Sequence, residues 1–103
     1  MESGKSIRCS IIIPAYNREK TLRRCLTSLG NQDYPRDKFE IIVVDDGSSD
    51  GTVQMLSNLA KKYRNLRYIK QFRKGPASAR NLGAKHARGE IIGFTDDDCV
   101  LSK

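Results

Sequence analysis

Six of the twelve acidic residues in this 103-residue chain fall in two groups, each directly after an apolar segment. The groups lie in EIIVVDDGSSDGT (40–52) and EIIGFTDDDCV (90–100), and their members are Asp45, Asp46 and Asp50, then Asp96, Asp97 and Asp98. Neighbouring carboxylates destabilise one another unless a cation or a hydrogen-bonding ligand lies between them. Mg²⁺ and Mn²⁺ prefer oxygen ligands and keep coordination positions open for phosphate oxygens. The two groups therefore predict a divalent-metal site that accepts a diphosphate, provided that the fold brings them together.

The elements that must position these groups alternate along the chain. Short apolar, β-branched runs predict strands over 7–14, 39–44, 66–72 and 90–95. Helices are predicted between them, over 17–32, 48–63 and 76–87. The first helix has Leu22, Cys25, Leu26 and Leu29 at i, i+3, i+4 and i+7, with Asn17 as its N-cap. Ser49 or Asp50 is the expected cap of the second helix, and Pro76 opens the third.

Strands that alternate with helices predict right-handed crossovers and a parallel sheet covered on both faces. The expected fold is therefore an α/β, Rossmann-like three-layer sandwich of about four mainly parallel strands and three helices, with residues 1–103 as a single domain. In such sheets ligands bind beyond the carboxyl ends of the strands. AYN (15–17), DDGSSD (45–50) and DDD (96–98) each follow a predicted strand and should converge there.

The loop after the first strand, PAYNRE, contains no GxGxxG and no GxxxxGK[ST], so a glycine loop that cradles phosphate is not expected. This loop offers instead the ring of Tyr16, which can stack on a base or simply pack. The amide of Asn17 can bond a ligand or the backbone.

The net charge of +7 is concentrated in one stretch, because 61–74 holds seven basic residues and no acidic one. Such a stretch can attract anionic lipid, nucleic acid or a phosphorylated substrate, or it can be a solvated surface. Its aromatic residues have strand spacing and are expected to pack, so no nucleic-acid partner is predicted; they are Tyr63, Tyr68 and Phe72.

Three cysteines without metal-ligand spacing, and the absence of a long apolar run or a leader, predict reduced thiols and a cytoplasmic location, at most at the inner face of a membrane.

Four blocks of the chain, of which the last two are adjacent, resemble the amino-terminal half of an inverting family 2 glycosyltransferase with the GT-A fold. They are SIIIPAYNREKTLRRCLTSLGNQDYP, FEIIVVDDGSSDGT, KGPASARNLGAKHARGE and IIGFTDDDC, in the usual order and spacing. The resemblance covers about Ser6 to Val100 and implies a nucleotide-sugar site.

The resemblance assigns expected roles on the nucleoside side of the site. Tyr16 matches the position whose ring lies against the base, and Pro14 and Ala15 match backbone contacts beside it. Asp46 resembles the aspartate that bonds a uracil-type base edge, and Asp45 would shape the turn.

The resemblance also implies a phosphate and metal side. Arg80 and Asn81 match positions near the nucleotide, with Arg80 facing ribose or phosphate. Asp96 to Asp98 match the DxD signature: Asp96 and Asp97 near ribose and metal water, Asp98 as direct ligand of Mn²⁺ or Mg²⁺, and Asp96 as the second candidate ligand. The metal would neutralise the diphosphate leaving group while a carboxylate deprotonates the acceptor hydroxyl.

In this family the catalytic base and the acceptor segments follow the DxD block, whereas this chain ends five residues after Asp98. No catalytic residue is therefore expected within the chain. It is expected to be a donor-binding fragment that is inactive alone, with an exposed sheet edge through which it forms a homodimer.

Two alternatives remain open at this point. A phosphorelay receiver domain also has an acidic pair and a later aspartate, which Asp45, Asp46 and Asp96 mimic, although the receiver pair follows the first strand. A non-catalytic module could instead use 61–74 to bind anionic membrane or RNA.

Overall fold

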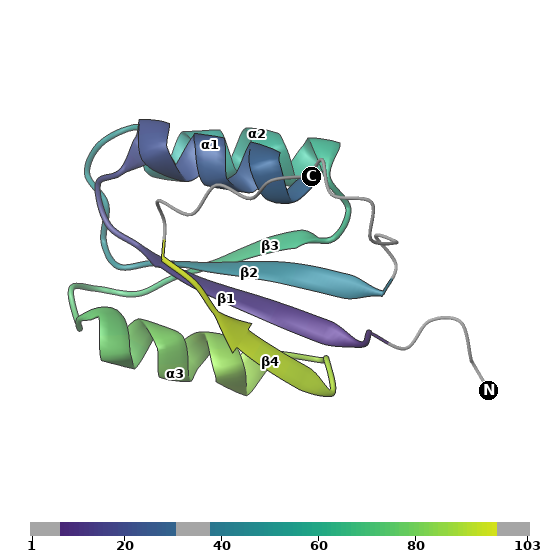
Figure 1. The fold of residues 1–103 in the computed structure, drawn as a ribbon. Coiled ribbons are helices and arrows are strands. Elements are labelled where there is room, and N and C mark those ends of the chain that lie inside the picture. The colour runs from purple at the N-terminus through teal and green to yellow at the C-terminus, as the bar shows by residue number, and fades with distance from the viewer. Residues whose placement is uncertain (1–6, 31–37, 97–103) are drawn as a thin grey trace.

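The computed structural model describes residues 7–30 and 38–96, which form one sheet with helices on both faces (Figure 1). All strand pairs are parallel and the order is β3-β2-β1-β4; the strands are β1 (Cys9–Ala15), β2 (Phe39–Asp45), β3 (Leu66–Lys70) and β4 (Ile91–Phe94). The helices are α1 (Glu19–Gly30), α2 (Thr52–Lys62) and α3 (Pro76–His86). Figure 1 shows α1 and α2 on one face of the sheet and α3 on the other. The predicted α/β, Rossmann-like fold is confirmed.

The apolar strands sort their side chains between the two faces because successive residues of a strand point to opposite sides. Ile13 and Val43, which are opposite one another in the register, belong to the larger cluster beneath α1 and α2. Ile12 and Ile42, the next pair, belong to the smaller cluster beneath α3. The four apolar positions predicted for the first helix are all buried: Leu22, Cys25, Leu26 and Leu29.

Helix α3 approaches the sheet closely at a glycine. A Cβ added to Gly83 would collide with Ile12 Cγ2 and would come within 3.2 Å of Val44 Cγ2. Because Gly83 carries no side chain, the helix can rest directly on β1 and β2. This contact fixes the position of the α3 amino terminus relative to the carboxyl ends of those strands.

A buried polar network ties the opposite end of the sheet together. Glu40 is 3% exposed and accepts hydrogen bonds from the Ser10 hydroxyl (2.7 Å), the Arg88 N–H (2.7 Å) and the guanidinium of Arg67 (2.8 Å). Burial raises the pKa of Glu40, but these hydrogen bonds and the Arg67 charge outweigh it and hold the pKa below its ordinary value. The network joins β1, β2 and β3 to the turn that leads into β4.

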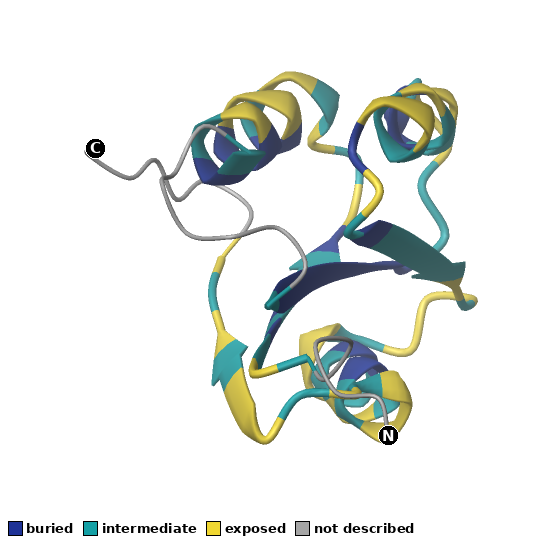
Figure 2. Cartoon of the chain, turned by 90° about the vertical axis from the view of Figure 1, so that its right-hand side faces the viewer, coloured by how far each residue is buried: buried dark blue, intermediate teal, exposed yellow. Residues whose placement is uncertain are grey.

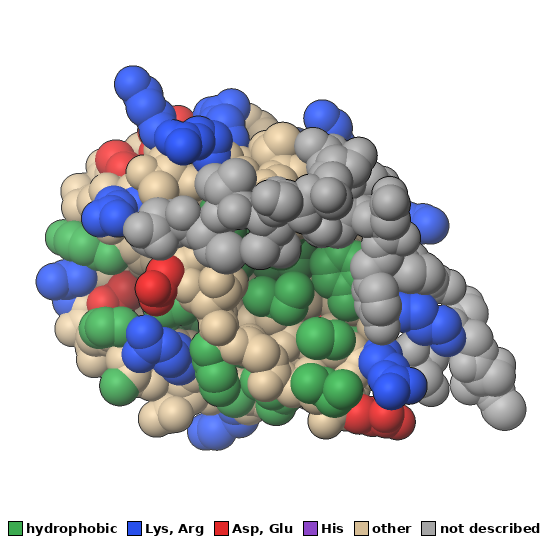
Figure 3. All heavy atoms as spheres, in the orientation of Figure 1, with side chains coloured by type: hydrophobic (Ala, Val, Ile, Leu, Met, Phe, Trp, Pro, Cys, Tyr) green, Lys and Arg blue, Asp and Glu red, His purple; other side chains and the backbone are tan. Residues whose placement is uncertain are grey.

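Strand β4 lies at one edge of the sheet and is the most exposed strand among the described residues (Figure 2). The side chains of Ile91, Ile92 and Phe94 are 53%, 41% and 53% exposed. Figure 3 shows hydrophobic side chains on this face of the molecule. The expected exposed edge with apolar side chains is therefore present, whereas dimerisation through it stays a prediction.

Three local predictions are wrong. Asn17 is not an N-cap: α1 begins at Glu19, its first turn is closed by the Leu22 N–H to Arg18 O bond, and Asn17 has a left-handed φ of 51°. The third strand ends at Lys70 rather than at residue 72. Phe72 does not pack, because it is 86% exposed.

The N-cap position of the second helix is held by neither Ser49 nor Asp50. Gly51 occupies the N-cap position and has no side chain to do the capping. Asp50 nevertheless accepts a hydrogen bond from the N–H of Thr52, the first helical residue, at 2.9 Å. Asp50 therefore supplies the capping oxygen from one position further out.

The basic stretch 61–74 does not form one continuous surface. Lys61 and Lys62 end α2, at the amino end of the sheet, whereas Lys70 ends β3 at the carboxyl end. Arg67 is bound to Glu40, and Arg73 is bound to Asp46. Contact between this stretch and anionic membrane stays a prediction.

Candidate functional site

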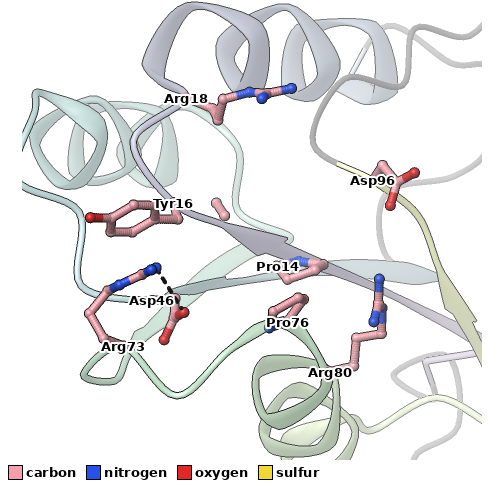
Figure 4. Close-up of a pocket in the computed structure, with 9 residues that line it drawn as sticks. Pro14, Tyr16, Arg18, Asp46, Arg73, Pro76, Arg80 and Asp96 are labelled. Carbon is pink, nitrogen blue, oxygen red and sulfur yellow. Dashed lines mark hydrogen bonds and ion pairs between the residues drawn. The ribbon is translucent and has the colours of Figure 1, made fainter.

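A pocket of about 460 Å³ opens at the carboxyl ends of the strands (Figure 4). Its lining comes from the ends of β1, β2 and β4, the segment after β3, the residue before α1 and the first two turns of α3: Pro14, Ala15, Tyr16, Arg18, Asp46, Arg73, Pro76, Arg80 and Asp96. The chain winds from β1 outward to β3 and then returns to place β4 on the other side of β1. The pocket thus lies where the strand order reverses, the place at which doubly wound sheets bind ligands.

Strand register brings the two acidic groups to the same rim. Asp45 is opposite Ala15, so Asp46 and Tyr16 leave neighbouring strands side by side, and the Asp46 N–H bonds Ala15 O at 2.8 Å. On the other side of β1, the Thr95 N–H bonds Ile12 O at 3.1 Å, which continues the ladder toward Asp96. Asp46 and Asp96 consequently line one pocket. Asp97 and Asp98 lie outside the described residues, so the structure does not place the expected metal ligand Asp98.

Asp46 is buried at 4% exposure and anchors the segment that follows β3. Its Oδ1 accepts bonds from the Lys74 N–H at 2.7 Å and from Gln71 Nε2 at 2.9 Å. Its Oδ2 accepts the Gly75 N–H at 3.0 Å and faces the Arg73 guanidinium at 3.4 Å. Two donors on each oxygen use the full acceptor capacity of a carboxylate.

The electrostatics of Asp46 follow from these contacts. Burial raises the pKa of this carboxyl, but the backbone bonds from Lys74 and Gly75, the Gln71 amide and the Arg73 charge together hold its pKa below the ordinary value. Asp46 is thus a stable carboxylate that faces the pocket. Gly75 has a φ of 95°, a conformation suited to glycine, which lets two successive N–H groups reach the same side chain.

Tyr16 is paired with a cation rather than simply packed. Its ring is 38% exposed, and the guanidinium carbon of Arg73 lies 3.7 Å from the ring centroid. Arg73 therefore contacts the Tyr16 ring and the Asp46 carboxylate at once, as Figure 4 shows. A cation over an aromatic face at this distance is attracted by the ring quadrupole.

Asn17 and Asp45 hold the loops that frame the pocket but do not line it. Asn17 Oδ1 accepts the Ser49 N–H at 2.7 Å and the Asp50 N–H at 3.3 Å, and the Asn17 N–H bonds Ser48 Oγ at 2.8 Å. Asp45 is 1% exposed, and its Oδ2 accepts the Ser48 N–H at 3.0 Å. The structure shows the amide of Asn17 bound to backbone, which is one of its two expected alternatives. It shows Asp45 bound to the backbone of the turn that follows β2.

Two arginines flank the pocket from opposite faces of the sheet. Arg18 precedes α1 and Arg80 lies on α3, and Figure 4 places both side chains around the pocket that Asp96 also lines. Asn81, which is exposed on α3, is not among the lining residues. The pocket thus combines a cationic pair with carboxylates, a composition that suits a phosphorylated ligand and a counter-cation.

Sequence reasoning missed three lining residues: Arg18, Arg73 and Pro76. Arg73 was counted only as part of the basic stretch, and Pro76 only as a helix start. The signal that could have found them is their position. Arg18 directly follows AYN, Arg73 lies between the third strand and the third helix, and Pro76 opens that helix.

Within residues 7–30 and 38–96, no three His, Cys, Asp or Glu side chains are grouped so that they could hold a metal ion. Asp96 is the one predicted metal ligand that the structure describes, and it is exposed at the pocket rim. A carboxylate in this position fits a hard cation that takes few protein ligands and several phosphate oxygens. No helix in the described part of the chain is long and apolar enough to cross a membrane.

The family model for glycosyl transferase family 2 matches residues 10–103. The chain belongs to this family. It is 40% identical over 91 residues to glycosyltransferase AglE of Haloferax volcanii, and this match covers 87% of the chain and 30% of AglE. It is 39% identical over 102 residues to TarS of Staphylococcus aureus, a poly(ribitol-phosphate) β-N-acetylglucosaminyltransferase, and this match covers 94% of the chain and 17% of TarS.

Solved structures of family members have the same fold. The mannosyltransferase PcManGT of Pyrobaculum calidifontis, solved with GDP-Man and Mn²⁺, superposes with a TM-score of 0.87 at 36% identity over 93% of this chain and 29% of its own. TarS 1–349 from Staphylococcus aureus, solved with UDP-GlcNAc, gives a TM-score of 0.78 at 40% identity over 89% of this chain and 27% of its own. The chain therefore spans less than a third of the length of these relatives.

The receiver-domain alternative is not supported. Receiver domains have the strand order 2-1-3-4-5, in which the second strand is at an edge. In the family 2 chain β2 lies between β1 and β3. The alternative of a purely membrane- or RNA-binding module is likewise unsupported by the family matches.

Proposed function

We propose that this chain is the donor-binding part of a glycosyltransferase and that its pocket binds a nucleoside diphosphate sugar, with uracil as the base. The observation that carries the proposal is the combination within one pocket of an aromatic ring, a buried carboxylate, two arginines and a rim carboxylate, contributed by Tyr16, Asp46, Arg18, Arg80 and Asp96. Such a set offers a stacking surface, an acceptor for a base N–H and charge for a diphosphate.

Each part of the donor has a proposed contact. The base stacks on Tyr16 beside Pro14 and Ala15, and its N–H edge faces Asp46. Arg80 and Arg18 approach the diphosphate from the two faces of the sheet. Ligand-bound relatives support a nucleoside diphosphate sugar as the donor, because TarS was solved with UDP-GlcNAc and PcManGT with GDP-Man. Of the two complexes, that of TarS supports uracil as the base.

Asp98 and Asp96 are proposed to hold the divalent metal, Mn²⁺ or Mg²⁺, with Asp97 close to the ribose. The bound metal would supply charge that neutralises the diphosphate leaving group. The Mn²⁺ in the PcManGT complex supports a metal-dependent donor site. Asp96 at the rim is exposed and so can reach a ligand in the pocket.

The whole protein is proposed to transfer the sugar to an acceptor hydroxyl with inversion at the anomeric carbon. We assign no catalytic base among the 103 residues. This assignment agrees with the coverage of the relatives, because the chain spans only 30% of AglE and 17% of TarS. Transfer by this chain alone is therefore not expected. A peripheral contact with anionic membrane through 61–74 and a homodimer through β4 remain further predictions, which vesicle sedimentation and light scattering would test.

Titration of the chain with UDP in the presence of Mg²⁺, followed by calorimetry and by amide NMR, tests the donor site. We expect saturable binding with shifts around the pocket, and line broadening near Asp96 when Mn²⁺ replaces Mg²⁺. Tyr16→Ala should weaken binding about five- to 150-fold, since a stacked base contributes about 1–3 kcal/mol. Asp98→Ala should remove the metal dependence.

Arg80→Ala should weaken UDP far more than uridine, because it removes a charge beside the diphosphate. The matched control is Arg64→Ala, which removes an exposed arginine at the opposite end of the sheet and should leave binding unchanged. No UDP binding at millimolar concentration, or equal losses from Arg64→Ala and Arg80→Ala, would contradict the proposal.

A further inference from the structure

Arg73 makes with the protein the two contacts that the proposed nucleobase would make. Its planar guanidinium lies 3.7 Å from the Tyr16 ring centroid, and its NH1 is 3.4 Å from Asp46 Oδ2. We propose that Arg73 is an internal competitor of the nucleobase, which the base must displace from Tyr16 and Asp46, and that Arg73 thereby lowers the affinity of the pocket for a base. This inference rests on the proposed function, because it concerns the same pocket.

The geometry leaves the base and Arg73 one shared position. A base that stacks on Tyr16 and also meets Asp46 must lie between the ring and the carboxylate. Figure 4 shows the Arg73 guanidinium in that position, next to the ring and joined to Asp46 by the dashed line. Both groups are flat, present a π face and donate N–H bonds, so each can replace the other.

Asp46 can exchange Arg73 for a base without releasing the segment it anchors. Its bonds to the Lys74 N–H, the Gly75 N–H and Gln71 are 2.7, 3.0 and 2.9 Å long. The contact with Arg73 is 3.4 Å and is the longest of the four. Departure of Arg73 therefore frees one acceptor position on Oδ2, and the backbone bonds remain.

The Arg73 side chain is free to leave. It is 60% exposed and lies in the connection between β3 and α3, so solvent can receive the guanidinium when the base enters. Its backbone has a φ of 25°, an uncommon conformation for a residue with a side chain. Exposed ion pairs and exposed cation–π contacts are both weak, so the competition should lower affinity only severalfold.

Selectivity follows from the acceptor that Arg73 leaves behind. A base with a ring N–H, such as N3–H of uracil, restores the lost hydrogen bond to Asp46. A base methylated at that nitrogen leaves the carboxylate oxygen without its fourth donor and meets it with an apolar group. Asp46 therefore disfavours every base that cannot offer an N–H at this edge, whether or not Arg73 is present.

Uridine, which carries no phosphate, is the probe that separates this effect from simple charge attraction. We expect Arg73→Ala and Arg73→Met to bind uridine about three- to tenfold more tightly than the unmodified chain, measured by NMR titration. The gain should be similar for uridine and 3-methyluridine, because Arg73 must leave before either base can stack on Tyr16, whereas uridine should bind more tightly than 3-methyluridine in every variant. In the unmodified chain, uridine should also move the Arg73 side-chain protons away from their ring-current-shifted positions over Tyr16.

Arg64→Ala is the matched control and should leave uridine affinity unchanged. Equal or weaker uridine binding by Arg73→Ala, or a gain for uridine that 3-methyluridine does not share, would overturn the competitor role. If the unmodified chain still binds UDP with Mg²⁺ in that case, the donor site stands and only the role of Arg73 fails. Absence of UDP and uridine binding in every variant would overturn both.

Discussion

Replacing Asp46 with asparagine should uncouple the segment after β3 from the sheet. The two backbone donors contact different oxygens, since the Lys74 N–H bonds Oδ1 at 2.7 Å and the Gly75 N–H bonds Oδ2 at 3.0 Å. An asparagine keeps one acceptor oxygen and replaces the other with an NH₂ donor. Whichever way the amide turns, one backbone N–H then faces another donor and loses its partner.

The expected loss of stability follows from the backbone hydrogen bond that asparagine cannot accept. Hydrogen bonds to charged groups contribute about 1.5–3 kcal/mol, and an unsatisfied buried donor costs about 1–3 kcal/mol, so Asp46→Asn should lower the free energy of unfolding by about 2–4 kcal/mol. For a domain of this size that corresponds to a fall in Tm of roughly 10–20 °C. Urea unfolding at pH 7, followed by circular dichroism, measures it.

The pH dependence gives a second, independent readout. The native pKa of Asp46 is depressed below its ordinary value of 3.8. Its stabilising contribution is therefore present above that value and is lost as the pH falls through the native-state pKa. The unmodified chain should lose this contribution in acid, and Asp46→Asn should show a flatter stability profile over the same range.

Glu90→Gln is the control for the loss of one negative charge, because Glu90 is exposed. It should change stability by less than about 0.5 kcal/mol, as surface substitutions usually do. If Asp46→Asn unfolds at the same urea concentration as the unmodified chain, the carboxylate does not hold the 71–75 segment and the argument for a preorganised pocket wall is refuted.

Two further substitutions test the frame behind the pocket. Glu40→Gln should lower the free energy of unfolding by about 2–4 kcal/mol at pH 7, because it weakens the buried pair with Arg67. Since the native pKa of Glu40 is depressed, the difference in urea midpoint from the unmodified chain should shrink as the pH falls below 4.5. A difference that stays constant with pH would contradict this. Gly83→Ala should lower the free energy of unfolding by about 1–3 kcal/mol, because the added methyl group overpacks against Ile12 and Val44. The control Ala77→Ser, on the exposed face of α3, should leave stability nearly unchanged. Thermal unfolding compares the two variants, and equal Tm values would show that α3 shifts freely.

Much of the fold could be predicted because each element has a local pattern. The spacing of Leu22, Cys25, Leu26 and Leu29 predicted the buried face of α1, and those residues are buried. The order of apolar runs predicted four parallel strands, since helical connections of this length require them. Asn17 was misassigned because its side-chain oxygen can accept a backbone N–H either from the next helix or from a distant loop. The N–H that it accepts belongs to Ser49, 32 residues away, and no local pattern in the sequence indicates that contact.

The candidate site was only partly predictable for the same reason. That polar residues at strand ends would converge followed from the topology, and Tyr16, Asp46, Arg80 and Asp96 do line one pocket. The pairing of Arg73 with Tyr16 joins residues 57 positions apart, and no local pattern marks it. The roles of Asp97 and Asp98 stay predictions, because these residues lie outside the described part of the chain.

The sequence by itself determined which segments become strands and helices, and that acidic residues follow two of the strands, because hydrophobic periodicity and strand direction are local properties. Only the tertiary structure decided what those acids do. Asp46 accepts four donors from residues 71–75 because the β2–β3 register carries that segment across the end of the sheet. Hydrogen bonds between segments depend on distance in space, which the order of residues does not contain.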